Sequence, residues 1–174
     1  MRSRLKRLDR AALRLLRTRL RSPAIDRAAL TYTAAGEFGA LWIALSLAGS
    51  VADRDRRGSW LVCGAVVPAA LTVNYVVKRA VRRRRPSLPG LPAVGRVPSS
   101  LSFPSGHAAT SFAGAEAIGT LAPEARAGLR AGAALMAFTR PYLGLHYPSD
   151  ALVGALLGAA VGRSTMALLV EGPK

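Results

Sequence analysis

Several residue types on which whole protein classes depend are scarce in this sequence of 174 residues. Cysteine occurs once, as Cys63, so an intramolecular disulfide is excluded, and no spacing of Cys and His that could hold zinc is present. Only 6% of the residues are aromatic, and none of them falls in residues 1–30, which leaves no platform there for stacking nucleic-acid bases. Acidic residues number 9 against 25 basic ones, and histidine occurs twice.

The basic residues are distributed unevenly along the chain. The formal net charge is +16, yet 51% of the residues are hydrophobic, and long uncharged stretches alternate with compact basic clusters. A disordered basic tail lacks the apolar content to form a core, so that class is excluded. The length fits one domain, and the segregated charge indicates a membrane protein. Basic residues interrupt every apolar run before Ala28, so we expect no signal-peptide core and a retained amino end.

Residues 1–30 contain ten Lys or Arg residues and two Asp residues. At about 100° per residue, a helix here places apolar residues on one face and basic residues on the other. The apolar face comprises Leu5, Leu8, Ala12, Leu15, Leu16 and Leu20, and the basic face comprises Lys6, Arg7, Arg10, Arg14, Arg17 and Arg21. We interpret residues 1–30 as a basic amphipathic segment lying on anionic lipid, with its helix ending near residues 22–23. A solvated helix and a nucleic-acid-binding arm are the alternatives.

The rest of the chain, residues 31–174, is predicted to form the membrane domain. The apolar stretches are 28–52, interrupted by Glu37, then 59–77, 107–122, 127–145 and 148–170. Each is long enough, or nearly so, to cross a bilayer as a helix. Gly154, Gly158 and Gly162 repeat every four residues, a spacing that lets membrane helices approach closely. The predicted fold is therefore all-α, a polytopic membrane helix bundle of about five spans, with a soluble helical bundle as the alternative.

Three clusters of polar residues lie near the ends of these stretches. They are Lys78 with Arg85-Pro86, then Pro104-Ser105-Gly106-His107, then Arg140 with His146 and Asp150. The clusters contain both histidines of the chain, near the same predicted water boundary. Histidine is rare in membrane spans, so its default interpretation there is functional.

The residue types in these clusters suit the cleavage of a phosphate ester. Fixed cations must neutralise the phosphate oxygens, and Lys78, Arg85 and Arg140 supply three. Ser105, the backbone of Gly106 and the start of the following helix add hydrogen-bond donors. His146 is a plausible nucleophile, because Asp150 lies four residues on and could orient the imidazole if the segment is helical. His107 remains to protonate the leaving group and then to activate water.

These clusters resemble the motifs of the type-2 phosphatidic acid phosphatase superfamily of membrane lipid phosphatases. KxxxxxxRP matches at Lys78, Arg85 and Pro86, and PSGH matches at all four positions. The third motif, usually SRxxxxxHxxxD, matches at Arg140, His146 and Asp150, with Thr139 in place of the usual Ser. The resemblance covers about residues 59–165.

The resemblance implies a helical core and metal-independent hydrolysis of a phosphate ester or anhydride, with no cofactor. It also implies a phosphohistidine at His146, acid–base catalysis by His107, and a substrate-binding set. That set is Lys78, Arg85, Ser105, Gly106 and Arg140.

The small size and the run from Val97 to Phe103 are similar to the small branch of that superfamily that acts on decaprenylphosphoryl-phosphoribose in the cell envelope. The predicted substrate is thus a polyprenyl-phosphoribosyl 5-phosphate. Polyprenyl diphosphate, phosphatidate and phosphatidylglycerophosphate are alternatives. From another class, a non-catalytic membrane-anchored binder of anionic lipid or nucleic acid is the alternative, whereas the paired histidines favour an enzyme. The partners we expect are membrane lipids and the lipid substrate, and no nucleic acid.

The remaining charges suggest orientation and pairing. Basic residues of the amino-terminal segment and of 79–84 predict an active site on the cytoplasmic side of the cell membrane. The run 82–84 is interpreted as a solvated strip facing lipid headgroups, with direct contact to the substrate as the alternative. Glu116 and Arg163 would lie well inside the bilayer, so we expect both to face the bundle interior and to lie near each other.

Overall fold

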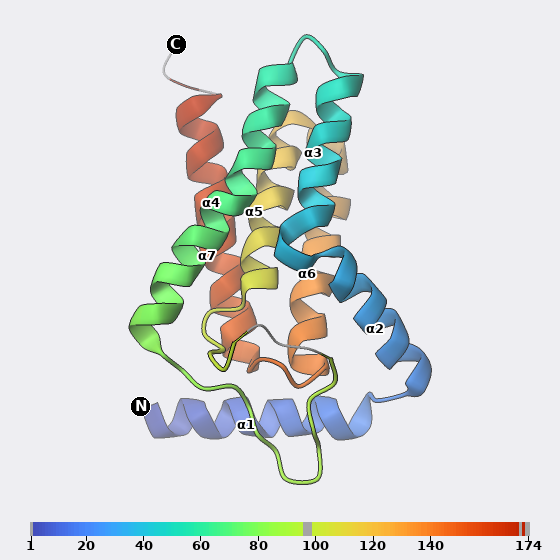
Figure 1. Cartoon of the computed structure of the whole chain (residues 1–174), viewed down its shortest axis with the longest axis vertical. Coiled ribbons are helices and arrows are strands. Elements are labelled where there is room, and N and C mark those ends of the chain that lie inside the picture. The colour runs from blue at the N-terminus through green and yellow to red at the C-terminus, as the bar shows by residue number, and fades with distance from the viewer. Residues whose placement is uncertain (1, 96–98, 171, 173–174) are drawn as a thin grey trace.

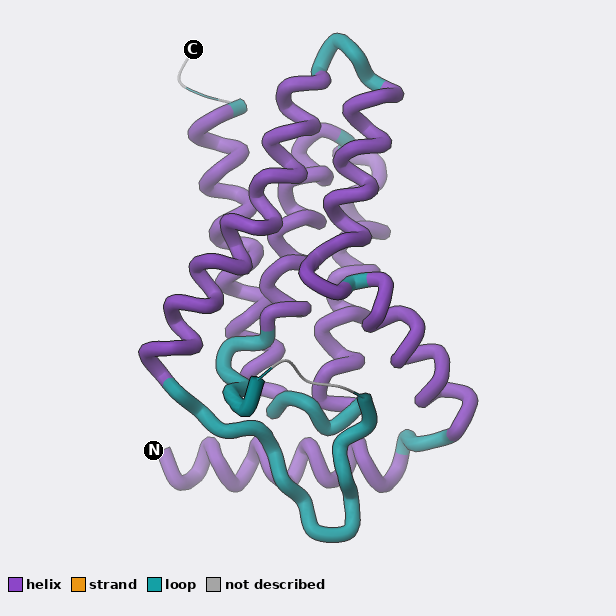
Figure 2. The backbone as a smooth tube through the Cα atoms, viewed as in Figure 1, coloured by secondary structure: helices purple, strands orange, loops and turns teal. Residues whose placement is uncertain are grey.

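The structure is a computed structural model that describes residues 2–95, 99–170 and 172. Seven α-helices account for most of this part of the chain (Figure 1). They are α1 (Arg2–Arg19), α2 (Pro23–Ala35), α3 (Ala40–Ala52), α4 (Arg57–Val81), α5 (Gly106–Leu121), α6 (Arg126–Tyr142) and α7 (Pro148–Leu169). Two short 3₁₀ helices, η1 (Glu37–Gly39) and η2 (Pro123–Ala125), complete the set. Helices and loops alone make up the described part in Figure 2, which confirms the prediction of an all-α fold.

Helix α5 forms the centre of the bundle, and α3, α4, α6 and α7 pack around it. Its residues are mostly small, and nearly all are buried from Ala108 to Leu121. Helix α7 packs closely on α5 through the predicted glycine repeat. A Cβ atom added to Gly158 would lie 2.0 Å from the carbonyl oxygen of Ala109, so this contact requires glycine. Backbone packing of this kind holds the first turns of α5 and α7, where the second and third motifs end, against each other.

Five helical units correspond to the five predicted apolar stretches. Helices α4 and α7 are long and apolar enough to cross a membrane, and the pair α2–α3 passes the same test as one span bent by 42°. Helices α5 and α6, with 16 and 17 residues, are shorter than that test requires. The bend follows Glu37, where Phe38 and Gly39 adopt positive φ angles of 50° and 80°. A Cβ at Gly39 would meet Val67 at 2.3 Å, so glycine suits both the turn and the packing.

Helix α1 lies across the end of the bundle at which α2, α5 and α7 begin (Figure 1). Leu5, Leu8 and Leu15 are exposed, as the predicted lipid-facing surface requires. A third face of α1 packs against the rest of the protein. It comprises residues that recur every four positions, namely Asp9, Leu13 and Arg17. The prediction that Arg17 lies on the solvated face is therefore wrong.

Arg17 is 1% exposed and donates hydrogen bonds to the carbonyl oxygens of Tyr142 and Pro92. Helix α2 begins at Pro23, with Ser22 accepting from the backbone N–H of Ile25 at 3.2 Å. The boundary at residue 30 therefore falls within α2, and the division into segments 1–30 and 31–174 stays a prediction.

The described residues between α4 and α5, 82–95 and 99–105, lie in loops below the bundle (Figure 2). The two ends of this region pair with each other, because the N–H of Arg85 donates to Ser100 at 3.1 Å and that of Ser102 donates to Arg83 at 2.8 Å. This pairing places the end of the first motif beside the second motif. Three helix ends and one loop thus meet at the end of the bundle that α1 crosses.

Candidate active site

The eight predicted site residues come together at one end of the bundle. Lys78 lies in the last turn of α4, the PSGH run leads into the first turn of α5, and Arg140 lies in the last turn of α6. His146 lies in the loop before α7, and Asp150 in the first turn of α7. Helix direction explains the convergence, since α4 and α6 end where α5 and α7 begin.

These residues surround a cavity of about 480 Å³, which we call the active-site cavity. Six of the eight line it, namely Lys78, Arg85, Gly106, His107, Arg140 and His146. The wall also contains apolar and uncharged groups and one carboxylate, comprising Glu37, Phe38, Leu71, Thr72, Asn74, Tyr75, Ser99 and Thr110. Ser105 and Asp150 are fully buried behind the wall. The cavity therefore combines a cationic floor with a partly apolar side.

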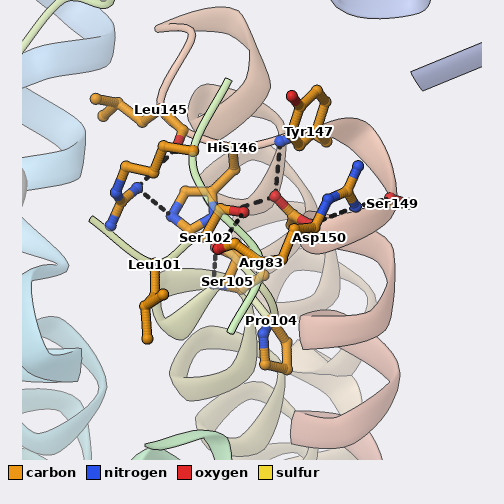
Figure 3. Close-up of polar contacts among 12 residues, drawn as sticks. Arg83, Leu101, Ser102, Pro104, Ser105, Leu145, His146, Tyr147, Ser149 and Asp150 are labelled. Carbon is orange, nitrogen blue, oxygen red and sulfur yellow. Dashed lines mark hydrogen bonds and ion pairs between the residues drawn. The ribbon is translucent and has the colours of Figure 1, made fainter. Parts of the chain in front are cut away.

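His146 is 2% exposed, and its ring lies between Arg85, which contacts it by a hydrogen bond, and the carboxylate of Asp150, which lies beyond hydrogen-bond distance. Its Nε2 lies 3.0 Å from Nη1 of Arg85, and its Nδ1 lies 3.8 Å from Oδ2 of Asp150 (Figure 3). Because a guanidinium only donates, Nε2 acts as an acceptor and Nδ1 carries the proton, which faces Asp150. Burial lowers the pKa of His146 to about 4; Asp150 opposes this shift, and the nearby cations Arg85 and Arg140 add to it. The ring is thus neutral at pH 7, with its lone pair on Nε2.

Asp150 approaches His146 in a different way from the one that the four-residue spacing suggested. His146 precedes α7, which begins at Pro148, so the two residues do not lie one turn apart on the same helix. Instead, the Asp150 carboxylate folds back over the helix start and accepts from the N–H of Tyr147 at 2.8 Å (Figure 3). This capping contact, rather than helical periodicity, brings the carboxylate to the imidazole.

His107 lines the same cavity from the first turn of α5. Its Nε2 lies 3.3 Å from the carbonyl oxygen of Thr33 and 3.8 Å from Oε2 of Glu37. Thr33 belongs to α2 and Glu37 to the bend that follows it. The bent span therefore contributes to the site, a contribution that the sequence motifs do not contain.

The three predicted cations differ in how their donors are occupied. Lys78 donates to the carbonyl oxygen of Pro104 at 2.9 Å, and Arg85 donates to Ser99 at 2.8 Å and Leu145 at 2.7 Å. Burial lowers the pKa of Arg85. Arg140 is 2% exposed, and its Nε and Nη1 have no hydrogen-bond partner within the described part of the chain. A buried guanidinium with unused donors is costly unless an anion completes it, so this end of the cavity suits a phosphate group.

Ser105 differs from its predicted role. Its side chain is fully buried, and its Oγ caps α5 by accepting from the N–H of Ala108 at 3.4 Å. Its backbone N–H donates to the carbonyl oxygen of Asp150 at 2.9 Å, which joins α5 to α7. The start of α5 still presents the backbone of Gly106 and His107 to the cavity, as expected from the motif.

Arg83 is the residue that sequence reasoning missed. Instead of belonging to a solvated strip, its side chain pairs with Asp150 at 2.8 Å and with Asp9 of α1 at 2.7 Å. The signal available in the sequence was the lone acidic residue, Asp9, within the basic face of α1. Among the residues that the structure describes, no group of three or more His, Cys, Asp or Glu side chains is placed to hold a metal ion.

Comparison with known proteins identifies the family of this chain. The family model of the PAP2 superfamily matches residues 58–172, a range that contains all three motifs and all eight predicted site residues. This chain belongs to the PAP2 superfamily. A decaprenylphosphoryl-5-phosphoribose phosphatase of Mycobacterium tuberculosis is 40% identical over 151 residues, covering 82% of each chain. The corresponding phosphatase of Mycolicibacterium smegmatis is 42% identical over 122 residues, covering 68% of this chain and 65% of the relative.

Solved structures of the superfamily share the fold. A phosphatidylglycerolphosphate phosphatase of Bacillus subtilis superimposes with a TM-score of 0.78 at 23% identity, covering 98% of this chain and 88% of that one. LpxE of Aquifex aeolicus superimposes with a TM-score of 0.72 at 25% identity, covering 91% and 94%. The predictions of the superfamily, of a helical membrane protein and of a lipid phosphatase are thereby confirmed.

Proposed function

We propose that this PAP2-superfamily phosphatase cleaves a phosphate monoester of a polyprenyl-phosphoribosyl lipid in the active-site cavity, through a phosphohistidine and without a metal ion. The observation that carries the proposal is Arg140, a buried guanidinium whose Nε and Nη1 have no partner among the described residues, in a cavity lined by both histidines. A phosphate would complete these donors, and Lys78 and Arg85 would bind its other oxygens.

The first chemical step uses the neutral His146. Its Nε2 attacks phosphorus while the bond from phosphorus to the ester oxygen breaks, and His107, in its protonated form, donates a proton to the departing alkoxide and becomes neutral. Arg85, which contacts Nε2 in this structure, moves its donor to a phosphate oxygen. The proton on Nδ1 faces Asp150, whose charge stabilises the positive ring of the intermediate.

The second step reverses the proton transfer. His107 takes a proton from a water molecule, whose oxygen attacks the phosphorus, and the bond from phosphorus to Nε2 breaks. Inorganic phosphate leaves, and His146 returns to its neutral form. Lys78, Arg85 and Arg140 face the transferring group throughout and offset the charge on its oxygens.

The apolar wall of the cavity supports a lipid substrate. Phe38 and Tyr75 line the cavity and are 64% and 57% exposed, so the wall continues onto the outer surface of the helices. A lipid tail held along this surface would keep the phosphate at the cationic floor. The name of the Mycobacterium tuberculosis relative, 40% identical, supports decaprenylphosphoryl-5-phosphoribose as the substrate.

A phosphate-release panel tests the proposal. Purified protein in detergent would receive decaprenylphosphoryl-5-phosphoribose, decaprenyl diphosphate, phosphatidate or phosphatidylglycerophosphate, each with and without EDTA. We expect the fastest release from the first substrate, unaffected by EDTA and blocked by vanadate. Preference for another lipid would overturn the substrate assignment, and release abolished by EDTA would overturn the metal-independent mechanism. Binding without turnover of any lipid would instead support the non-catalytic alternative.

We further propose that the protein resides in the cell membrane with the active site on the cytoplasmic side. Basic helix α1 and Arg79 lie at the active-site end, which supports this orientation. Thr18→Cys is exposed on α1, Asp55→Cys is exposed at the opposite end, and the native Cys63 is buried. A membrane-impermeant maleimide should label Asp55→Cys but not Thr18→Cys in intact cells. The reverse pattern would place the site on the outer face.

A further inference from the structure

The side chain of Arg83 connects the surface helix α1 to the first turn of α7. Its Nη1 donates to Oδ1 of Asp150 and to Oγ of Ser149, both at 2.8 Å, and its Nη2 donates to Oδ2 of Asp9 at 2.7 Å. The guanidinium also lies 3.9 Å from the centre of the Tyr147 ring. Figure 3 shows Arg83 beside Ser149 and Asp150, on the side away from His146. Arg83 does not line the active-site cavity.

Like Arg83, Asp9 is held in place by several hydrogen bonds. It is 4% exposed although it belongs to a helix whose leucines face outward. Its Oδ1 accepts from the backbone N–H of Ser149 at 3.0 Å, and its Oδ2 accepts from Oγ of Ser149 at 2.5 Å as well as from Arg83. A carboxylate is favoured at this position because it faces the amino-terminal end of α7. Helix α1 is thus joined to α7 through charge-assisted hydrogen bonds.

Asp150 depends on this connection for its orientation. It is fully buried, and a buried carboxylate is costly unless it is paired. Its Oδ2 accepts from Tyr147 and faces the imidazole of His146, so its other oxygen must be satisfied from behind. Arg83 provides that contact, and within residues 2–95, 99–170 and 172 it is the only Lys or Arg side chain paired with Asp150.

We propose that Asp9 and Arg83 are positioning residues for catalysis, which hold Asp150 in the orientation that serves His146 and make the surface helix α1 a part of the active site. The inference rests on the proposed function, because it assigns His146 as the nucleophile. It assigns a role to a segment outside the three motifs and outside the matched family range of residues 58–172.

The pH dependence of the reaction separates positioning from folding. The charged and titratable groups that line the cavity with His146 are Glu37 from η1, Tyr75 and Lys78 from α4, Arg85 from the loop, His107 from α5 and Arg140 from α6, and Asp150 of α7 lies 3.8 Å from its Nδ1. Arg83 is the cation behind Asp150 and shares its negative charge. Without Arg83, more of that charge acts on the imidazole, the protonated ring is favoured, and the pKa of His146 rises. The acidic limb of kcat/KM then moves to higher pH.

The test is a double-mutant cycle with Arg83→Gln, Asp9→Asn and their combination, in the full chain reconstituted in anionic vesicles. We expect Arg83→Gln to lower kcat about tenfold with KM changed less than about twofold, and to move the acidic limb up by about half a pH unit. Asp9→Asn should lower kcat several-fold. The double variant should lose no more than Arg83→Gln, because both act through one connection. Arg83→Lys should recover part of the loss.

Two matched controls remove the same charges elsewhere. Arg82→Gln changes the neighbouring residue, for which the structure shows no side-chain contact, and Asp55→Asn changes an exposed residue at the far end. Both should retain wild-type kcat within about twofold. A value of kcat for Arg83→Gln within twofold of wild type, an equal loss in Arg82→Gln, an unmoved acidic limb, or additive losses in the double variant would each overturn the proposal.

The design also covers misfolding and failure of the proposed function. If Arg83→Gln does not fold, as judged by gel filtration and thermal unfolding, Arg83→Lys and Asp9→Asn provide the same readouts with smaller changes. If the wild-type chain releases no phosphate from any lipid of the panel, the proposed function fails. If the wild type is active and the Arg83 variants match it, only the positioning role fails.

Discussion

Two groups of basic side chains in this protein meet opposite surroundings. At the active-site cavity, Arg140 is buried with unused donors, and neither it nor Lys78 pairs with a carboxylate in the described part of the chain. Deeper in the bundle, Arg130 and Arg163 both pair with Glu116, which is 5% exposed, at distances of 2.8 to 3.2 Å. The expectation that Glu116 and Arg163 lie near each other is confirmed, with Arg130 as a third member. Glu116 faces the bundle interior as expected, but the side chain of Arg163 is 63% exposed, so the expectation that it also faces the interior is wrong.

The difference shows that the presence or absence of carboxylate partners distinguishes a structural cluster from a binding site, although both contain the same residue types. Glu116 uses both oxygens on two guanidiniums, so this cluster is complete and has little reason to bind an anion. The guanidinium of Arg140 is incomplete, and burial makes its unused donors costly until an anion arrives. Arg83 shares a feature with each group. Like the arginines at Glu116 it is paired with carboxylates, and one of these, Asp150, belongs to the proposed active site.

Removal of the nucleophile should produce the largest effect. We expect His146→Ala to lower kcat about 1,000-fold or more, because it removes the proposed nucleophile that forms the covalent intermediate. Phosphate release under single-turnover conditions measures this loss, and rapid quenching in base, in which a phosphohistidine survives, should detect the labelled intermediate in the wild type alone. Undiminished turnover in His146→Ala would remove the mechanism. The substitution should leave the ion pairs of Glu116 intact, so an unfolding temperature equal to that of wild type serves as the control for folding.

The two clusters should respond differently to the same substitution. Arg140→Gln should lower kcat/KM about 100-fold, because an unpaired cation is taken from the developing charge on phosphate. Arg130→Gln should change kcat/KM less than about twofold, since Arg163 still pairs with Glu116. Phosphate-release assays on both variants make the comparison. Similar losses in the two variants would show that pairing does not distinguish the clusters.

The cations near His146 should also affect how kcat/KM depends on pH. Burial and the neighbouring arginines lower the pKa of His146 to about 4, so the ring protonates only below that pH. We expect kcat/KM to fall about tenfold for each pH unit below 4, where the nucleophilic ring of His146 becomes protonated. The free energy of unfolding should change with pH in the same direction as the activity. In the unfolded chain the imidazole binds a proton below about pH 6.5, whereas the buried ring does so only near pH 4, so stability is lost as the pH falls toward 4. An acidic limb near pH 6.5 would contradict the burial of this ring.

The smallest effect on activity is expected from the paired cluster. Glu116→Gln removes the carboxylate that two partly exposed guanidiniums share, and should lower the free energy of unfolding with kcat within about twofold of wild type. Thermal unfolding in detergent measures the change. Glu124→Gln, an exposed residue on the same side of the bundle, is the matched control and should unfold like wild type. A large loss of activity without loss of stability would show that this cluster takes part in the reaction.

Much of the fold and of the candidate site could be predicted because the signals are local. Apolar stretches predicted the helical units, and the four-residue glycine repeat predicted the face of α7 that packs on α5. Motif spacing predicted eight residues that the structure brings to one end of the bundle. The prediction for Ser105 was less complete, since its side chain caps α5 from behind the cavity wall.

By itself, the sequence determined the helices, their small-residue contacts and the identity of the charged groups, because each depends on periodicity or composition within a short segment. Only the tertiary structure decided which basic residues are paired and which are free. Asp9 and Ser149 are 140 positions apart, and Arg83 and Asp150 are 67 apart. Whether such groups meet depends on how helix ends and loops are placed in space, and hydrogen bonds act only over about 3 Å. That placement separates the free guanidinium of Arg140 from the paired guanidinium of Arg163, although both are arginines on neighbouring helices of the same bundle.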